Sequence, residues 1–528
     1  MTDSAEPVPV SELQCDTAAS RRDHRLTQLF YAFCGLHLLI WTMVPTFSQP
    51  NAPLDTIEML FWGHEWQWGY HKHPPLPAWL AELSTAWIGP YAWPTYLLAQ
   101  LCTLACFGAV WSVMRRAAGA AAALICVMIL EGSFYYNFTT PEFNNNVVSR
   151  ACWALTIAFL YQGLIRQRLS GWILAGLMLG LGMLAKYDTA VLALTMLLFS
   201  VAHPLGRAAW KTPGPWLALV ISLGCFAPHV WWLQQNDFPT LAYFQESSHS
   251  QGVWSDHFTR PGRFLLTQLG SVGLCLALLI PALGWKWCRQ DRSGTALTRH
   301  DQAFLLAFGL GPLALILTFS LLTGATIKSM WGAPLFTFLG ATLLCLFRYR
   351  DDLLTVRRIG GLSIGFSVIC AGALIVHDVA LPGMRHKLSR VHFPGRELAQ
   401  QVDALCREHL GGAPHIAAGP WWTAANAAFY SQYHPSVYSY LSEQESPWMS
   451  DEIFRKEGGV VVWQEDEVLP GFLEDLKRRI PGFVELDPLQ IAPAASGDFD
   501  PLTIHVGIVR PESALIQQAH VPDTARVN

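Results

Sequence analysis

Apolar runs of about twenty residues recur through the first 380 positions of this chain. A helix of that length crosses the hydrocarbon layer of a membrane, and a chain inside that layer must satisfy its own backbone hydrogen bonds. Charged residues make up only 14% of the sequence, against about 25% in soluble domains. We therefore predict a polytopic α-helical membrane protein. A net charge of −4 argues against a nucleic-acid partner.

About eleven spans are predicted, without a convincing internal repeat. The stretch 170–203 is short for two spans, so one of them is expected to be broken or re-entrant. The predicted spans lie near 26–44, 91–114, 117–136, 143–163, 170–186, 188–203, 215–234, 264–286, 302–322, 329–347 and 359–377.

Three parts are expected along the chain: a disordered cytoplasmic N-terminus (1–25), a transmembrane catalytic domain (26–378) and a soluble C-terminal region (379–528). Lys and Arg concentrate in every second connection, beginning with the N-terminus, and such basic connections stay in the cytoplasm. This bias predicts an inside N-terminus and an outside C-terminus. It places the 45–90 loop on the outer side of the membrane. The Trp-rich, sparsely charged composition suits a bacterial inner membrane, whose outer side is the periplasm.

The C-terminal region alternates short strand-like and helix-like stretches, which indicates a small α/β domain. Strands are expected at His415–Ala418, Gly459–Trp463 and Leu502–Val509, and helices at Gly395–Leu410, Thr423–Tyr433 and Gly471–Arg479. We expect this region to cap the membrane domain and contact a substrate.

The 45–90 loop carries the best indication of function. Pro53 opens a segment of helical potential in which Asp55, Glu58 and Trp62 share one face, because residues three and four apart are neighbours on a helix. The two carboxylates suit proton transfer. The simpler alternative for Asp55 is an acid that interacts with the N-terminal helix dipole.

A cationic run, His71-Lys72-His73, precedes the stiff pair Pro74-Pro75 in the same loop. A phosphate group needs cationic donors, and a lysine serves as a point charge. His71 and His73 are alternatively ligands of a divalent metal. A solvated basic turn remains the plainest interpretation.

Three further basic residues are expected on the outer side. Arg260 and Arg263 precede a span, and Lys328 opens another. All three are candidates for binding a donor phosphate. The alternative is that they anchor the helix ends by reaching toward the lipid headgroups.

The remaining candidate site residues are one acidic residue and two residues of opposite charge. Glu142 lies at another outer turn and is a possible second acid. Lys186 and Asp188 lie in apolar surroundings and are interpreted as intramembrane charges. Such charges are expensive and are usually functional or paired, so the two residues have either a functional role or neutralise each other.

Several of these residues carry a family resemblance. Asp55 and Glu58, then Gly69-Tyr70 and the run 73–76 (His-Pro-Pro-Leu), resemble the family-thirty-nine glycosyltransferases of GT-C fold. That family includes protein O-mannosyltransferases and the bacterial aminoarabinose and galacturonic acid transferases that act on lipid A. The stretches 182–187 and 328–334 are similar to its bacterial branch, and the likeness covers roughly residues 26–350.

The resemblance implies a polyprenyl-phosphate sugar donor, an envelope acceptor (lipid A, another lipid, a glycan or a protein) and inversion at the anomeric carbon. It gives Asp55 the role of general base or acceptor-orienting group. The family often has adjacent Asp and Glu, whereas Thr56 and Ile57 separate Asp55 from Glu58 here. The sequence identifies no particular cofactor, and a divalent metal at His71 and His73 stays open.

Two other functions fit the same composition. A transporter or flippase for lipid-linked substrates needs many spans but no acidic outer loop, and internal repeats are expected in it. A membrane phosphotransferase favours a metal cluster or a nucleophilic Ser or Thr. Incubation with a polyprenyl-phosphate sugar distinguishes the three functions. Its outcome is sugar transfer for a glycosyltransferase, transport without cleavage for a transporter, and phosphate transfer for a phosphotransferase.

Overall fold

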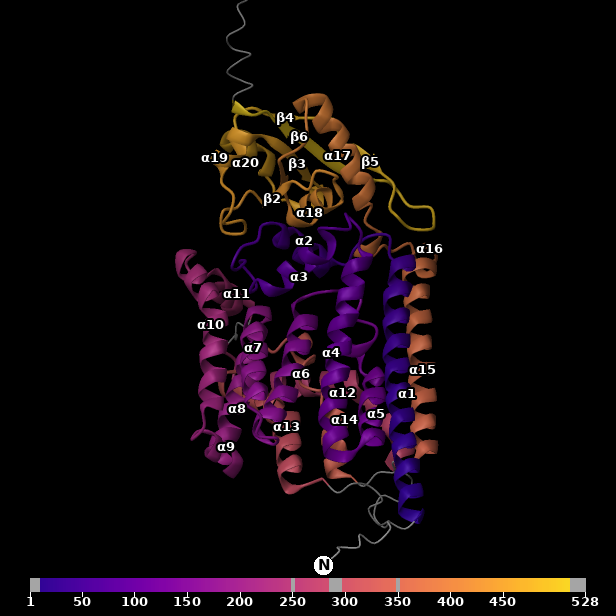
Figure 1. The fold of residues 1–528 in the computed structure, drawn as a ribbon. Coiled ribbons are helices and arrows are strands. Elements are labelled where there is room, and N and C mark those ends of the chain that lie inside the picture. The colour runs from indigo at the N-terminus through magenta and orange to yellow at the C-terminus, as the bar shows by residue number, and fades with distance from the viewer. Residues whose placement is uncertain (1–9, 248–251, 284–296, 348–351, 513–528) are drawn as a thin grey trace, which may run out of the picture.

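The computed structural model describes residues 10–247, 252–283, 297–347 and 352–512. A bundle of long helices forms one part of the molecule, and a sheet with its own helices forms the other (Figure 1). Two short helices, α2 (Leu54–His64) and α3 (Leu76–Thr85), lie between these parts. The first turns of α1 lie at the opposite end of the bundle from the sheet.

Seven helices among the described residues are long and apolar enough to cross a membrane. They are α1 (Val10–Ser48), α4 (Trp93–Ala118), α6 (Asn145–Leu164), α10 (Pro213–Gln235), α12 (Asp256–Leu283), α13 (Arg299–Thr323) and α15 (Leu353–Ile375). Shorter helices of the bundle are α5 (Ala120–Met128), α7 (Leu169–Ala185), α8 (Thr189–Ala202), α9 (Pro204–Ala209), α11 (Pro239–Ser247) and α14 (Leu339–Leu346).

Two predicted spans are not continuous helices. The stretch predicted at 117–136 is α5 followed by the 3₁₀ turns η1 (Ile129–Gly132) and η2 (Phe134–Tyr136). The stretch predicted at 329–347 begins with η3 (Ser329–Gly332) and becomes α-helical only at α14. Pro334 lies in this irregular part and lacks the backbone N–H that a continuing helix would use. The span count of eleven stays a prediction.

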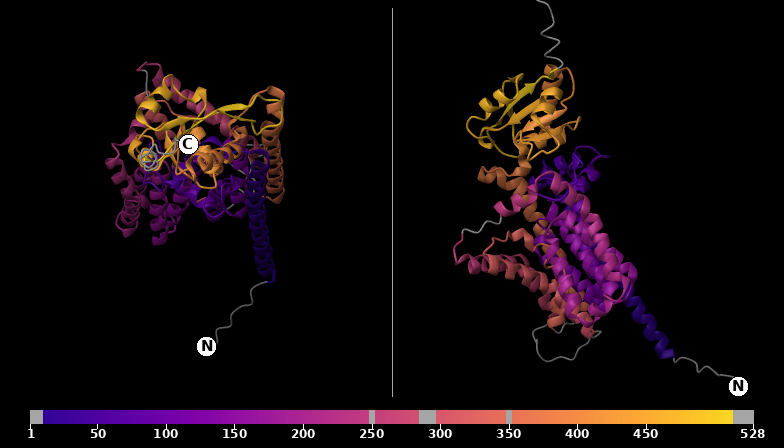
Figure 2. Two further views of the ribbon diagram at one scale, coloured as in Figure 1. Left: turned by 90° about the horizontal axis from the view of Figure 1, so that it is seen from above. Right: turned by 90° about the vertical axis from the view of Figure 1, so that its left-hand side faces the viewer.

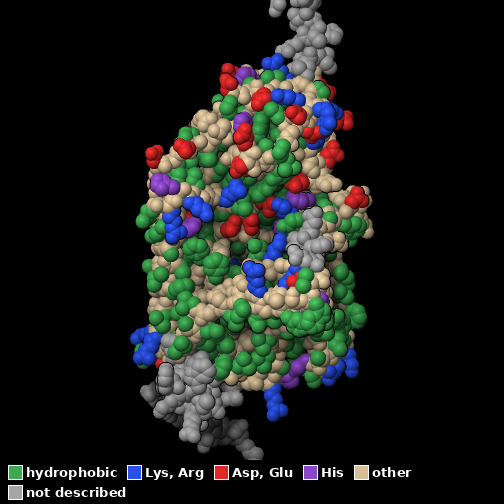
Figure 3. Space-filling model, turned by 180° about the vertical axis from the view of Figure 1, so that it is seen from behind, with side chains coloured by type: hydrophobic (Ala, Val, Ile, Leu, Met, Phe, Trp, Pro, Cys, Tyr) green, Lys and Arg blue, Asp and Glu red, His purple; other side chains and the backbone are tan. Residues whose placement is uncertain are grey.

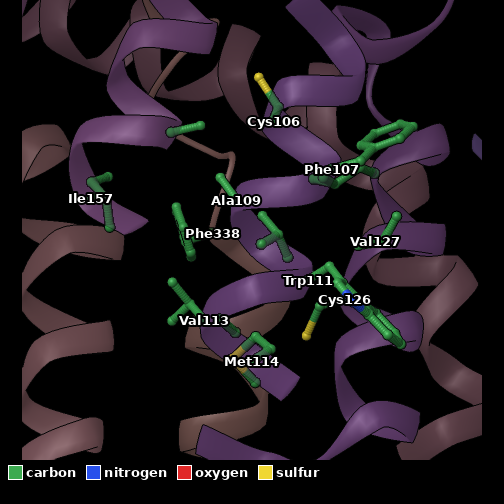
Figure 4. Packing of buried hydrophobic residues seen from close by; sticks show 14 of the residues in the cluster. Cys106, Phe107, Ala109, Trp111, Val113, Met114, Cys126, Val127, Ile157 and Phe338 are labelled. Carbon is green, nitrogen blue, oxygen red and sulfur yellow. The ribbon is translucent and has the colours of Figure 1, made fainter. Parts of the chain in front are cut away.

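Close packing holds the bundle together near its centre. Phe107, Trp111 and Val113 of α4 pack in the same cluster as Cys126 and Val127 of α5 (Figure 4). Association of helices in lipid depends on such van der Waals contact, and small residues let the backbones approach closely. The alanine-rich start of α5 is buried in this cluster.

The layer between the two parts consists of α2 (Leu54–His64) and α3 (Leu76–Thr85). Ile57, Trp62 and Tyr70 are fully buried in an apolar cluster that also contains residues of the bundle and of the sheet. Gly69 lies so close to Trp232 of α10 that an added Cβ would be 2.4 Å from its ring. The outer loop is therefore packed against both parts of the molecule.

The C-terminal region holds a sheet of strand order β2-β1-β3-β6-β4, with β5 paired to β6. Strands β1, β2 and β3 are parallel, and β6 is antiparallel to β3, β4 and β5. The strands are β1 (Ile416–Gly419), β2 (Ser436–Ser439), β3 (Gly459–Trp463), β4 (Phe483–Glu485), β5 (Leu489–Ile491) and β6 (Leu502–Val509). The helices are α16 (Leu381–Arg385), α17 (Gly395–Leu410), α18 (Trp421–Tyr430), α19 (Asp451–Glu457) and α20 (Phe472–Arg479).

The sheet and its helices form a separate layer above the bundle in the side view (Figure 2). The three predicted strands and three predicted helices of this region are confirmed to within two or three residues. The predictions missed β2, β4 and β5, because runs of three or four residues give too short a pattern to distinguish from a turn. They also missed the short helices α16 and α19, of five and seven residues.

The contact between α7 and α10 gives a stability prediction. An added Cβ at Gly176 would be 2.5 Å from the backbone of Ala218, whereas Gly224 on α10 has open space around it. Gly176→Leu should lower the free energy of unfolding by at least about 1–3 kcal/mol through overpacking. Thermal unfolding in detergent measures this, with Gly224→Leu as the matched control. Equal melting temperatures for the two variants would contradict the packing.

Candidate active site

Asp55 lies in the first turn of α2 and contacts the loop that precedes α6. The backbone N–H of Asp55 donates to Glu142 Oε1 (3.1 Å), and Asn144 Nδ2 donates to Asp55 Oδ2 (3.1 Å). Thr56 Oγ1 donates to the carbonyl of Phe143 (3.1 Å). A first-turn N–H has no partner within its own helix, so the Glu142 carboxylate satisfies it. Asp55 and Glu142 are thereby brought together.

Asn144 connects this contact to the bundle. Its Oδ1 accepts from the backbone N–H groups of Asn146 (2.9 Å) and Val147 (3.3 Å), which caps the N-terminus of α6. Asparagine is a preferred residue at such a position. One side chain therefore both starts α6 and holds the Asp55 carboxylate.

Glu58 and Lys72 form a buried ion pair one turn further along α2. Lys72 Nζ donates to Glu58 Oε1 at 2.7 Å. The same Nζ lies 5.5 Å from the ring centroid of Trp421, at the start of α18. The cation of the outer loop thus contacts both a carboxylate of its own loop and an aromatic face of the C-terminal region.

Burial raises the pKa of the carboxyl groups in this layer. The pKa of Glu58 rises to about 7, against the attraction of Lys72, and the pKa of Glu142 rises to about 7 through burial and the nearby charge of Asp55. The pKa of Asp55 is also raised by burial, while Asn144, Lys72 and Lys186 act in the opposite direction. Two neighbouring carboxyls in a buried site favour sharing a proton near neutrality.

His71 and His73 are not cations here. Burial lowers the pKa of each imidazole to about 3, and Lys72 adds to the shift. Both rings meet Trp62 and Tyr243 edge to face. The sequence predicted a cationic run of three residues, but only Lys72 carries a charge. The two neutral imidazole rings beside it each still have an N–H to donate.

The metal alternative gains no support from the described residues, where no group of three His, Cys, Asp or Glu side chains could hold a metal ion.

Lys186 and Asp188 lie at the turn between α7 and α8, beside the start of α6. Their side chains form an ion pair of 3.4 Å, Lys186 Nζ donates to Asn146 Oδ1 (2.6 Å), and Ser149 donates to Asp188 Oδ1 (2.9 Å). The sequence left open whether these two residues neutralise each other, and in the structure they form a pair. Lys186 is nevertheless near enough to Asp55 to favour its ionised form.

The remaining basic candidates lie at the edges of this group. Lys328 Nζ is 5.4 Å from the ring of Tyr243, the same ring that His71 and His73 contact. Arg260 pairs with Asp256 (2.6 Å) and donates to Thr326 Oγ1 (2.6 Å). Arg263 on the same helix is exposed. A role for either arginine in phosphate binding stays a prediction.

Sequence reasoning missed four participants. Asn144 and Asn146 belong to an Asn-rich run after Pro141-Glu142, where the N-cap preference was the available signal. Tyr243 and Trp421 carried no local signal, because each reaches the outer loop only through the tertiary fold.

Known proteins resemble this chain over most of its length. The family model described as dolichyl-phosphate-mannose-protein mannosyltransferase matches residues 72–232. Lipid A galacturonosyltransferase RgtD of Rhizobium johnstonii is 24% identical over 391 residues, which are 72% of this chain and 74% of RgtD. Lipopolysaccharide core galacturonosyltransferase RgtA of the same organism is 22% identical over 406 residues, covering 71% and 78%.

Solved structures share the architecture. ArnT from Cupriavidus metallidurans in complex with undecaprenyl phosphate superimposes with a TM-score of 0.61 at 14% identity, over 91% of this chain and 98% of ArnT. The apo form gives 0.60, over 92% and 98%. The fold is that of the GT-C glycosyltransferases. The chain is a membrane glycosyltransferase of this class, and it resembles the enzymes that modify lipid A.

The raised carboxyl pKa values predict a pH dependence of stability. The folded protein holds protons on Glu58, Glu65 and Glu142 up to about pH 7, whereas an unfolded Glu loses its proton near about 4.3. These carboxyls therefore lower the free energy of unfolding as pH rises through this range, whereas His71 and His73, which bind protons below about 6.5 only when unfolded, act in the opposite direction. The net fall is expected from about pH 6.5 to about 7.5, where only the carboxyl contribution remains.

Thermal unfolding across that range tests the sign. Glu142→Gln, which keeps an oxygen for the Asp55 N–H, should reduce the fall in melting temperature. Glu474→Gln, on the exposed face of α20, should leave it unchanged. A pH profile of Glu142→Gln that runs parallel to that of the unmodified protein would contradict the assignment.

Proposed function

We propose that this protein transfers a sugar from a polyprenyl-phosphate donor to an envelope acceptor, on the periplasmic face of a bacterial inner membrane. RgtD and RgtA are named for lipid A and the lipopolysaccharide core, and ArnT has been solved with undecaprenyl phosphate. These names favour a lipid A or lipopolysaccharide acceptor and make galacturonic acid the first sugar to test.

The observation that carries the proposal is the position of Asp55. Its carboxylate lies beside Glu142 and within the field of Lys72 and Lys186. A base needs a pKa near the working pH, and burial moves the Asp55 pKa upward. Asp55 takes the proton of the acceptor hydroxyl, an assistance that typically contributes about 10²–10⁴-fold to the rate.

The reaction is a single displacement. The acceptor oxygen attacks the anomeric carbon, the bond from that carbon to the phosphate oxygen breaks, and polyprenyl phosphate leaves with the electron pair. Negative charge then grows on the phosphate. Lys72 and Lys328 offset this charge, with His71 and His73 as neutral N–H donors and Arg260 and Arg263 as further cations at the surface.

Glu58 and Glu142 support the base rather than replace it. Glu58 holds Lys72 through the 2.7 Å ion pair. Glu142 holds the start of α2 through the Asp55 N–H, and as a second acid it can share the proton that Asp55 receives.

The periplasmic assignment rests on two features. Asp55, Lys72 and the C-terminal region lie at the end of the bundle opposite the N-terminal turns of α1. Basic side chains line the lower rim of the molecule, at that N-terminal end (Figure 3). Basic ends of spans stay in the cytoplasm, so the candidate site faces outward.

Asp55→Asn tests the base. The variant should transfer sugar at least about 10²-fold more slowly, while undecaprenyl phosphate still raises its melting temperature as in the unmodified protein. Purified protein is incubated with undecaprenyl-phosphate galacturonic acid and lipid A vesicles, and the products are identified by mass spectrometry.

Asp237→Asn is the matched control, because Asp237 is exposed and Asn accepts its positive φ of 57°. Full turnover by Asp55→Asn would remove Asp55 as the base. Transport without cleavage, or transfer of phosphate instead of sugar, would replace the proposed function with one of its alternatives.

A further inference from the structure

The C-terminal region meets the outer loop at two places: Trp421, which follows β1, lies over Lys72, and the start of β2 donates to Glu65 through Ser436 and Val437. From β1 the chain crosses to β2 on one side and then returns past β1 to β3 on the other. In open α/β sheets, ligands bind outside the carboxyl ends of the strands where the direction of the crossovers reverses. That point lies here between β1 and β3.

Polar side chains gather at this reversal. Thr423, in the first turn of α18 after β1, donates to Glu467 Oε2 (2.6 Å). Gln464, which follows β3, donates to Thr423 Oγ1 (3.2 Å). Burial raises the pKa of Glu467. A carboxyl, an amide and a hydroxyl thus converge from the ends of two strands.

The end of β2 adds an aromatic ring and a second carboxylate. Tyr440 has a φ of 50°, and its N–H donates to the carbonyl of Gly419 at the end of β1 (2.7 Å). A tyrosine in this left-handed conformation is strained. Its side chain is 42% exposed. Glu445 Oε2 accepts from Ser439 Oγ (2.8 Å).

These groups lie beside the candidate active site. Trp421 stacks on Phe61 of α2 and lies over Lys72 Nζ. The charge of Glu445 acts on both Glu58 and Lys72, and the charge of Lys72 acts on Tyr440. Acidic and basic side chains gather in a hollow between the C-terminal region and the apolar flank of the bundle (Figure 3).

We propose that this strand-end cluster, consisting of Trp421, Thr423, Tyr440, Glu445, Gln464 and Glu467, binds a sugar ring of the acceptor. The inference rests on the proposed function and names the part of the acceptor that is recognised. Aromatic faces cover the apolar side of a sugar ring, and carboxylate and amide oxygens accept hydrogen bonds from its hydroxyl groups.

The chemistry favours a hydroxyl-bearing ring over a phosphate group. Glu445 and Glu467 belong to the cluster, and Glu465 and Asp466 are exposed beside it, so a phosphate would meet like charges. In the proposed function the donor phosphate meets Lys72, which lies over the Trp421 ring, and Lys328, which lies over the Tyr243 ring. The acceptor sugar therefore approaches from the C-terminal region and the donor from the bundle.

Saccharide binding tests the cluster without requiring turnover. The full-length protein in detergent is titrated with the disaccharide of N-acetylglucosamine, and tryptophan fluorescence reports binding. Glu445→Gln and Glu467→Gln should each raise the dissociation constant at least about tenfold, and inorganic phosphate should not compete. The control Glu474→Gln should bind as the unmodified protein does.

Kinetics then separate this inference from the proposed function. With undecaprenyl-phosphate galacturonic acid and lipid A vesicles, Glu445→Gln should raise KM for the acceptor at least about tenfold and leave KM for the donor within about twofold. Unchanged acceptor KM in both Glu variants, absent disaccharide binding, or competition by phosphate would each overturn the inference. Disaccharide binding without any sugar transfer would instead count against the proposed function.

Discussion

Burial of the outer loop between two larger bodies is the constraint on which the candidate site depends. Ile57, Trp62 and Tyr70 are fully buried in one apolar cluster that extends from the bundle to the sheet. Fully burying a side chain of this size contributes about 1.5–3 kcal/mol. That packing fixes α2 as a rigid element. Asp55, Glu58 and Lys72 are therefore held in place, although the loop joins two spans and would otherwise be free to move.

Interrupted helices in the bundle make the contact with Asp55 possible. The chain leaves α5 through two 3₁₀ turns, and the buried Glu131 in the first of them is bonded to His37 of α1. Asn137 donates to the carbonyl of Glu131, and Tyr136 donates to Thr337. These buried polar contacts hold the chain where it turns toward α2.

The carboxylates of this layer are stabilised in two ways, by direct ion pairs and by charges at longer range. Glu58 has a direct partner in Lys72 and Asp188 has one in Lys186, whereas Asp55 has none as close among the described residues. Asp55 is held by an amide donor and by the more distant field of both lysines. A carboxylate in that situation is stabilised enough to remain in a buried site, yet it keeps a raised pKa. Such perturbed groups concentrate at functional sites.

The sequence by itself determined the class of the fold and the segment that carries the site. Apolar length predicted the helical bundle, and the residues of the first outer loop carried the resemblance to GT-C glycosyltransferases, which the fold bears out. Periodicity extends over a few residues, so it could not show that Glu142 and Asn144 meet Asp55 across more than eighty positions. Only the tertiary structure decided this, because burial and neighbouring charge arise from contacts between distant segments. The same burial made His71 and His73 neutral and brought Trp421 over Lys72.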